Sequence, residues 1–167
     1  MMNRRPFALP ALLAALAGAL PACDPGSGAQ GTTELALSSR EKFSLSENSR
    51  ALVLLWGYDR TLADAGATLI SRFNQSASKL PLKLDVPANP HELIDQGLGP
   101  VAQHNAKFYF NVFIDLDGDG QICMGDLVQD YDAADQQFFD YELPASVTFP
   151  VIPQADDFCR SLDSIAS

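Results

Sequence analysis

The sequence predicts an all-β fold, an antiparallel β-sandwich of about seven to eight strands in a single domain over residues 34–167. Several short runs place apolar residues at a period of two, which is typical of strands. Proline and glycine mark turns between these runs at fairly regular spacing. No long stretch has the 3.6-residue period of an amphipathic helix. These three observations together favour two packed sheets over any helical architecture.

The first half of the domain contains four predicted strands. Residues Thr33 to Leu37 form the first and Ala51 to Tyr58 the second. The second is the continuous apolar run ALVLLWGY, so we expect both of its faces to be covered. Gly66 to Phe73 and Leu80 to Val86 follow, and the latter alternates with leucine at every second position.

The second half contains the most aromatic strand, Lys107 to Asp115, whose alternation predicts one buried face formed by Phe108, Phe110, Val112 and Ile114. Before it, Asn89 to Pro100 predicts at most one helical turn, because glycines interrupt it. Residues 127–131 alternate as a further strand, and Phe138 to Pro153 supplies one or two more. The paired carboxylates Asp156 and Asp157 are predicted to belong to a solvated tail.

The segment DLDGDGQICMGD, Asp115 to Asp126, has the spacing of a calcium-binding EF-hand loop. Ca²⁺ is a hard cation that takes six to eight oxygen ligands. The predicted ligands are the carboxylates of Asp115, Asp117, Asp119 and Asp126 and the carbonyl group of Gln121. Gly120 allows the sharp turn, because glycine adopts such dihedral angles without strain. Ile122 is expected to point away from the ion and to anchor the loop to a core.

The segment also resembles the loops of bacterial dockerin repeats, which likewise end in Asp. It occurs once, and the flanking residues predict strands, so the chain is not a dockerin, and we expect the loop to link two strands of a hairpin. A plain turn is the alternative, because Asp-Gly pairs are favoured in turns for their own reasons. Magnesium is disfavoured because it requires a tighter octahedral shell with several waters.

The first residues predict export and lipid anchoring. Residues 1–22 have the basic start and short apolar run of a signal peptide. The following Leu-Pro-Ala-Cys resembles a bacterial lipobox, which implies that Cys23 is lipidated, and residues 23–33 form a flexible Gly/Ser-type tether. Ordinary secretion that leaves Cys23 as a plain thiol is the alternative. The expected location is the bacterial cell envelope, anchored to a membrane and facing the periplasm or the exterior.

Two further cysteines, Cys123 and Cys159, are expected to form a disulfide, because exported chains meet an oxidising environment. Two isolated thiols are the alternative. Without residues 1–22 the chain keeps nine basic and 21 acidic residues, a net charge of −12. This charge and the absence of a basic cluster exclude nucleic acid as a favoured partner.

The sequence gives no support for an enzyme. His91 and His104 stand alone in loop-like segments, and none of the common nucleophile, phosphate-binding or zinc motifs occurs. No catalytic residue is predicted. Trp56, the only tryptophan, lies in an apolar strand and is expected to belong to the core.

Residues 66–95 resemble small bacterial lipoproteins of the YbaY type, on the spacing of apolar residues around GATLISRF and LPLKLDVPANPHELID. The resemblance implies a transthyretin-like, or prealbumin-like, sandwich. The predicted function is a lipid-anchored, calcium-stabilised module for binding or scaffolding in the envelope, with an envelope protein as its possible partner. The alternative is a pilotin-like or chaperone lipoprotein that assists an envelope secretion component, a role found among some relatives of that family.

Overall fold

The structure is a computed structural model that describes residues 30–62, 64–133 and 137–165. The predicted signal peptide, Cys23 and residues 23–29 of the predicted tether lie outside the described residues. The longer strands are β1 (Gln30–Ser38), β2 (Arg50–Asp59), β3 (Thr68–Ser76), β4 (Leu82–Pro87), β5 (Ala106–Asp115) and β9 (Ser146–Pro153). The shorter elements are β6 (Gln121–Ile122), β7 (Leu127–Gln129), β8 (Phe139–Asp140) and β10 (Arg160–Ser161), with 3-10 turns η1 (Pro90–Leu93), η2 (Gln103–Asn105) and η3 (Leu162–Ser164).

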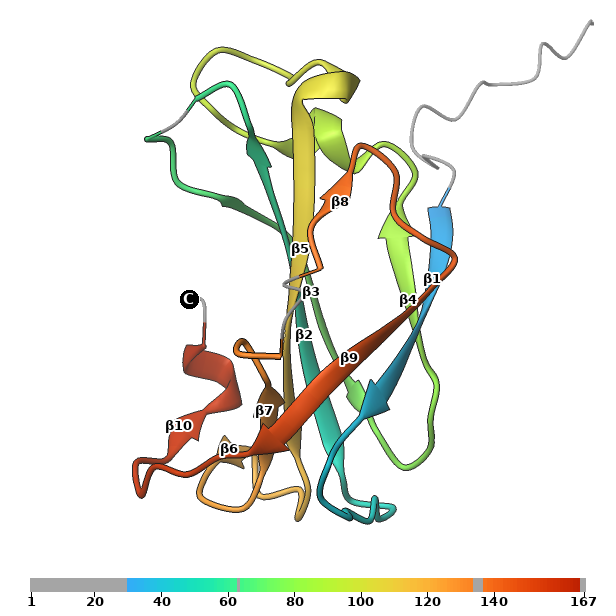
Figure 1. Cartoon of the computed structure of the whole chain (residues 1–167), viewed down its shortest axis with the longest axis vertical. Coiled ribbons are helices and arrows are strands. Elements are labelled where there is room, and N and C mark those ends of the chain that lie inside the picture. Colours follow the sequence, from blue (N-terminus) through green and yellow to red (C-terminus); the bar gives the residue numbers. More distant parts are fainter. Residues whose placement is uncertain (1–29, 63, 134–136, 166–167) are drawn as a thin grey trace, which may run out of the picture.

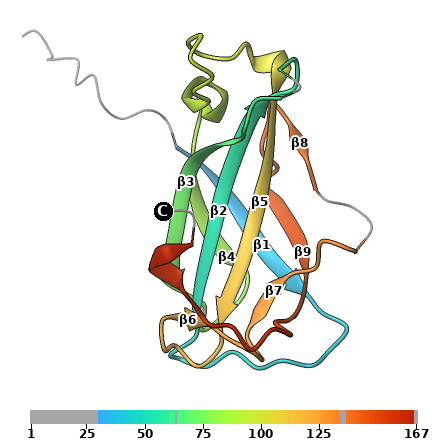
Figure 2. The same ribbon diagram turned by 90° about the vertical axis from the view of Figure 1, so that its left-hand side faces the viewer.

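The fold is all-β, as the sequence predicts, and it is built on one eight-stranded sheet. The strand order is β3-β2-β5-β7-β9-β1-β4, and β8 adds to β5. The sheet curls so that β1, β4 and most of β9 face β2, β3 and β5 across the core, which gives the two layers of a sandwich (Figure 1, Figure 2). The described part of the chain contains no helix long and apolar enough to cross a membrane.

The expected antiparallel pairing holds for every strand pair except β1 and β9, which run parallel from Glu34↔Ser146 to Ser38↔Pro150. The sheet is therefore mixed. A parallel pair joins strands whose connection crosses the fold, and here more than a hundred residues separate the two partners in the chain. Strand β1 also begins at Gln30, so residues 30–33 of the predicted tether belong to the sheet.

β2 and β5 form the centre of the fold, paired over their whole length from Arg50↔Asp115 to Asp59↔Ala106. The four residues predicted to form one face of β5 are all buried: Phe108, Phe110, Val112 and Ile114. They pack between the layers with residues of the opposite strands, including Leu35 and Phe149. Burial of these large side chains is the main stabilising term of the domain.

The outer face of β2 is also covered, as its continuous apolar run predicts. Leu52 and Leu54 form a second buried cluster with Ile122 from β6 and Leu162 from η3. Asp156 and Asp157 are exposed, as predicted, but the residues after them, 160–165, pack onto the sheet. The sequence-based reasoning missed this because the segment is short and polar, with only Leu162 and Ile165 to indicate packing.

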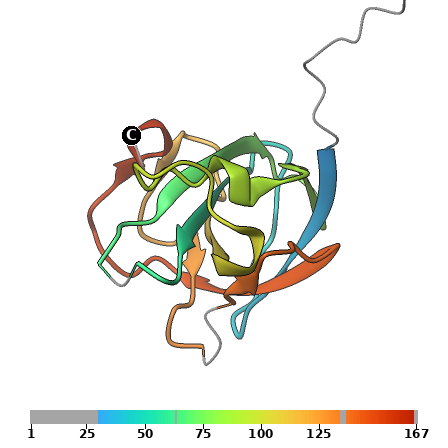
Figure 3. The same ribbon diagram turned by 90° about the horizontal axis from the view of Figure 1, so that it is seen from above.

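Strand β9 passes from one part of the sheet to the other. Its first half pairs with β1 up to Pro150, and its second half pairs with β7 from Val151 to Pro153. Proline has no N–H to donate, so it is tolerated where the pairing changes partner. The Pro150 carbonyl group still accepts a hydrogen bond from the Asp130 N–H at 2.9 Å. Seen from above, the strands surround the core in an almost continuous ring (Figure 3).

Candidate metal site

The Asp115–Asp126 loop connects two paired strands, as predicted. Asp115 is the last residue of β5, and Asp126 directly precedes β7. The two strands pair antiparallel through Phe113↔Val128 and Ile114↔Leu127. Strand pairing therefore brings the first and last residues of the loop together, where an EF-hand would use two helices.

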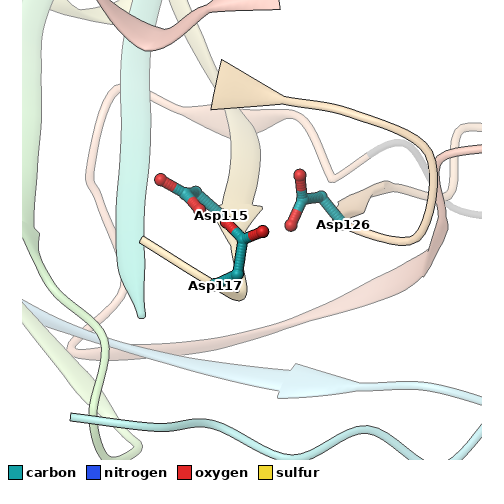
Figure 4. Close-up of side chains that lie close together, drawn as sticks. All are labelled: Asp115, Asp117 and Asp126. Atoms are coloured by element: carbon teal, nitrogen blue, oxygen red, sulfur yellow. The ribbon is translucent and has the colours of Figure 1, made fainter. Parts of the chain in front are cut away.

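Three carboxylates meet at the base of this loop. One oxygen from each of Asp115, Asp117 and Asp126 lies within 4.8 Å of the others. Figure 4 shows Asp126 approaching from the side of the loop opposite to Asp115 and Asp117. Asp115 is fully buried and Asp126 is only 7% exposed. The residues that the sequence separates by eleven positions thus form one group of hard oxygen ligands.

Backbone N–H groups of the loop surround the two buried carboxylates. The two oxygens of Asp115 accept hydrogen bonds from the N–H groups of Gly118 and Gly120, at 2.7 and 2.8 Å. The two oxygens of Asp126 accept hydrogen bonds from the N–H groups of Leu116 and Cys123, both at 2.8 Å. A carboxylate offers about four lone-pair sites, so each keeps capacity for a further ligand. These bonds fix the loop around the carboxylate group.

The buried carboxyl group of Asp115 has a raised pKa and no cationic partner among the described residues. Burial raises the pKa of Asp115 above its ordinary value, and the neighbouring Asp117 and Asp126 raise it further, although the hydrogen bonds from Gly120 and Gly118 oppose this. The ion pairs among the described residues join Glu34 to Lys83, Glu92 to His91 and Asp140 to Lys107, and none involves the loop. A buried carboxylate without a cationic partner is costly unless it is protonated or coordinates a metal.

Three carboxylates, two of them buried, match the all-oxygen ligands that Ca²⁺ takes, so the residues present fit the ion. Asp119 is not part of the group of carboxylates that lies within 4.8 Å. Asp119 instead accepts a hydrogen bond from the Gln121 N–H at 2.8 Å, which stabilises the turn. Asp119 and the Gln121 carbonyl group remain predicted ligands.

The predicted disulfide between Cys123 and Cys159 is present and joins positions 36 residues apart. It lies next to the pairing of β6 with β10, where Arg160 faces Ile122. The Leu162 N–H also donates to the Gly120 carbonyl oxygen at 2.9 Å. Ile122 is 3% exposed and anchors the loop to the outer apolar cluster, as predicted.

Two residues that sequence reasoning missed also hold the loop. The Ser49 side chain is fully buried, and its hydroxyl donates to the Leu116 carbonyl oxygen at 2.7 Å. Asn48 lies so close to Gly118 that a Cβ added to the glycine would be 2.3 Å from the Asn48 carbonyl oxygen. Both contacts join segments about 70 positions apart, so no local pattern in the sequence indicates them.

No protein-family model matches the chain, and no curated protein sequence matches it. Among solved structures, the chain is similar to an alternative pilotin from the type II secretion system of Vibrio cholerae. The two share 21% sequence identity, with 76% of this chain and 97% of that chain covered, at a TM-score of 0.44. A similarity of this size carries no argument about the function of this chain.

Proposed function

We propose that this protein is a binding or scaffold module of the cell envelope whose β-sandwich is stabilised by Ca²⁺ in the Asp115–Asp126 loop. The observation that carries the proposal is the convergence of Asp115, Asp117 and Asp126 within 4.8 Å. None of the ion pairs among the described residues gives these carboxylates a cationic partner. A divalent cation offsets two of the three negative charges in this group and fixes the end of the β5–β7 hairpin. Asp119 and the Gln121 carbonyl group complete the proposed ligand set.

The disulfide supports the envelope location in this proposal. Disulfides persist in oxidising compartments such as the periplasm and the cell exterior. The Cys123–Cys159 bond clips the end of the chain to the ion loop, so both elements stabilise the same corner of the molecule. Lipid anchoring through Cys23 is part of the proposal and rests on the lipobox resemblance alone.

Thermal unfolding of the purified protein in millimolar Ca²⁺, in Mg²⁺ or in chelator tests the calcium site. At a calcium concentration about ten times the dissociation constant, linkage stabilises the fold by about 1.4 kcal/mol, or a few degrees in Tm. Mg²⁺ should substitute poorly because it requires a smaller octahedral shell. Identical melting curves of the wild type in calcium and in chelator would show that the loop is an ordinary turn.

Asp117→Asn is the variant of choice for this experiment. Asp117 is exposed, and its Oδ1 accepts the Asp119 N–H at 3.1 Å, a bond that an asparagine oxygen can also accept. In chelator the variant should be at least as stable as the wild type, because one charge leaves the repelling group. Its calcium response should be smaller. Asp85→Asn, on the exposed side of β4, makes the same charge change and should keep the full response.

The pilotin-like alternative remains a prediction from the sequence. It requires a partner from a secretion machinery, so capture of envelope proteins on the membrane-bound protein separates it from a general scaffold role. Recovery of a secretion component in that capture would favour the chaperone function, with the ion loop as a purely structural feature.

A further inference from the structure

A cleft separate from the ion loop lies on the outer face of β5, between β7 and β8. Its volume is about 460 Å³, within the ordinary range for small-molecule sites. Aromatic residues and side-chain amides dominate the lining: Tyr58, Tyr109, Tyr131, Phe138, Asn111 and Gln129. β2 and β5 supply Tyr58, Tyr109 and Asn111, so the floor is the rigid centre of the sheet.

The aromatic rings of the cleft leave apolar surface open to solvent. Phe138 meets Tyr109 edge to face at a centroid distance of 5.8 Å and Tyr58 at 6.3 Å. On the neighbouring strand, Trp56 stacks on Tyr109 at a centroid distance of 6.3 Å with an interplanar angle of 11°. Phe138 is still 45% exposed and Tyr131 is 47% exposed. Tyr58, Tyr109 and Phe138 are thus held in place by one another, while Phe138 and Tyr131 keep surface open to solvent.

Two amide side chains of the lining have an unpaired acceptor. Gln129 is 6% exposed, and its Oε1 has no hydrogen-bond partner among the described residues. The same holds for Oε1 of Gln137, whose Nε2 donates to the Thr148 carbonyl oxygen at 2.9 Å. A buried acceptor without a partner destabilises the protein, because it has lost its hydration and gained no hydrogen bond. Both oxygens are themselves covered, so a ligand that brings hydrogen-bond donors pairs them once the two side chains turn toward the cleft.

The described lining of the cleft contains no charged side chain, although the whole chain has a net charge of −10. None of its described lining residues is Asp, Glu, Lys, Arg or His. Burial raises the pKa of the Tyr109 and Tyr131 hydroxyl groups, so both stay neutral at physiological pH. The Tyr131 hydroxyl already accepts a hydrogen bond from Asn111 at 3.0 Å. A charged ligand would lose its hydration here without gaining a partner.

We propose that this cleft binds a neutral carbohydrate, with a pyranose ring against the exposed aromatic faces and hydroxyl groups donating to Gln129 and Gln137. The C–H face of a sugar ring is apolar and carries partial positive charge, which suits the negative face of an aromatic ring. Its hydroxyl groups supply the donors that the unpaired acceptors need. A proline-rich peptide also suits an aromatic groove, but proline has no N–H to donate. The proposal concerns a different site from the calcium loop and does not depend on it.

Binding is measured by isothermal titration of the full protein with neutral oligosaccharides of glucose, galactose, mannose and N-acetylglucosamine, each up to about 10 mM, a concentration that detects millimolar affinity. A proline-rich decapeptide is titrated in parallel. Trp56 is the only tryptophan and stacks on Tyr109, so its fluorescence gives a second readout at the cleft. All titrations are made in calcium and in chelator, which keeps a failure of the calcium site distinguishable from a failure of the cleft.

We expect at least one oligosaccharide to bind saturably and to change the Trp56 emission. Phe138→Ala should weaken that binding by about tenfold or more, since the variant removes a stacking face. Gln129→Ala should also weaken it by removing the buried acceptor. Phe158→Ala is the matched control, an aromatic residue 69% exposed and outside the cleft lining. Melting curves verify that each variant is folded, and Tyr131→Ala replaces any variant that is not.

Three outcomes would overturn the proposal. The first is that none of the oligosaccharides binds at 10 mM. The second is that an oligosaccharide binds with equal affinity to the wild type and to the Phe138→Ala and Tyr131→Ala variants, which would place it elsewhere. The third is that only the proline-rich peptide binds, which would make the cleft a peptide site.

Discussion

Gly118 is the glycine of the ion loop with the least room for a side chain. Its φ of +80° lies in the left-handed region, and a Cβ there would collide with the Asn48 backbone. Gly120 has a similar φ of +85°, but a Cβ there meets nothing within 4 Å. The two glycines therefore separate the effect of backbone conformation from that of a close contact.

We predict that Gly120→Ala lowers the free energy of unfolding by about 1–2 kcal/mol, the ordinary cost of a left-handed alanine. Gly118→Ala should lose about 1–3 kcal/mol more, because the Asn48 backbone must move. Urea unfolding in chelator measures both values without a contribution from bound metal. Equal losses for the two variants would contradict the close contact.

A second prediction at this scale concerns Ser49. Its hydroxyl donates to the Leu116 carbonyl oxygen and accepts the Ser46 N–H at 2.8 Å. Ser49→Ala leaves both groups without this partner, so we expect a loss of about 1–3 kcal/mol in unfolding free energy. Ser46→Ala is the control. The Ser46 hydroxyl is 3.4 Å from the Leu116 carbonyl oxygen and exposed, so its loss should matter less. A larger loss for Ser46→Ala than for Ser49→Ala would refute the supporting role of Ser49.

At the scale of the elements, the end of the chain is held to the sheet by several independent contacts. The disulfide and the β6–β10 pair fix residues 159–161. Arg72 from β3 donates to the carbonyl oxygens of Leu162 and Ile165, and Leu162 fills the outer apolar cluster. This segment covers the outer face of β2, which would otherwise expose leucine.

Loss of the disulfide is predicted to destabilise the domain by roughly 3–4 kcal/mol, the chain-entropy value for a closed loop of this length. The Cys123→Ser/Cys159→Ser variant should show this in chemical unfolding, and hydrogen exchange at the Leu162 amide should become faster. Reducing agent serves as the control, because it should destabilise the wild type and leave the double variant unchanged. Unaltered exchange at Leu162 would show that Arg72 and the apolar contacts suffice.

At the scale of the whole molecule, the described domain begins with β1 at Gln30, seven residues after the predicted lipidation site. So short a connection would hold the domain close to a membrane surface, since an extended residue spans at most about 3.3–3.6 Å.

The anchoring hypothesis predicts that Cys23→Ser moves the protein from the membrane fraction to the soluble fraction. A single lipid chain gives only marginal membrane binding, so stable anchoring depends on the complete lipid modification. Metabolic labelling with a fatty acid, followed by fractionation, measures both effects. Equal labelling of the wild type and the variant would remove Cys23 as the modified residue.

Local patterns in the sequence determined the all-β class, the buried face of β5, the doubly covered β2 and the position of the acidic loop. Each depends on side-chain alternation or on turn residues that are close in the chain, so each can be read without a structure. The disulfide could be predicted as well, because the expected assignment of Cys23 to lipid leaves Cys123 and Cys159 as one pairing.

Only the tertiary structure decided the parallel pairing of β1 with β9, the docking of residues 160–165, the support of the loop by Ser49 and the aromatic cleft. These features join segments that lie far apart in the sequence. Their formation depends on which strands become neighbours when the whole core is buried, and alternation within one strand carries no information about its neighbours. The tertiary structure likewise decided which carboxylates meet, because Asp126 reaches Asp115 only through the pairing of β7 with β5.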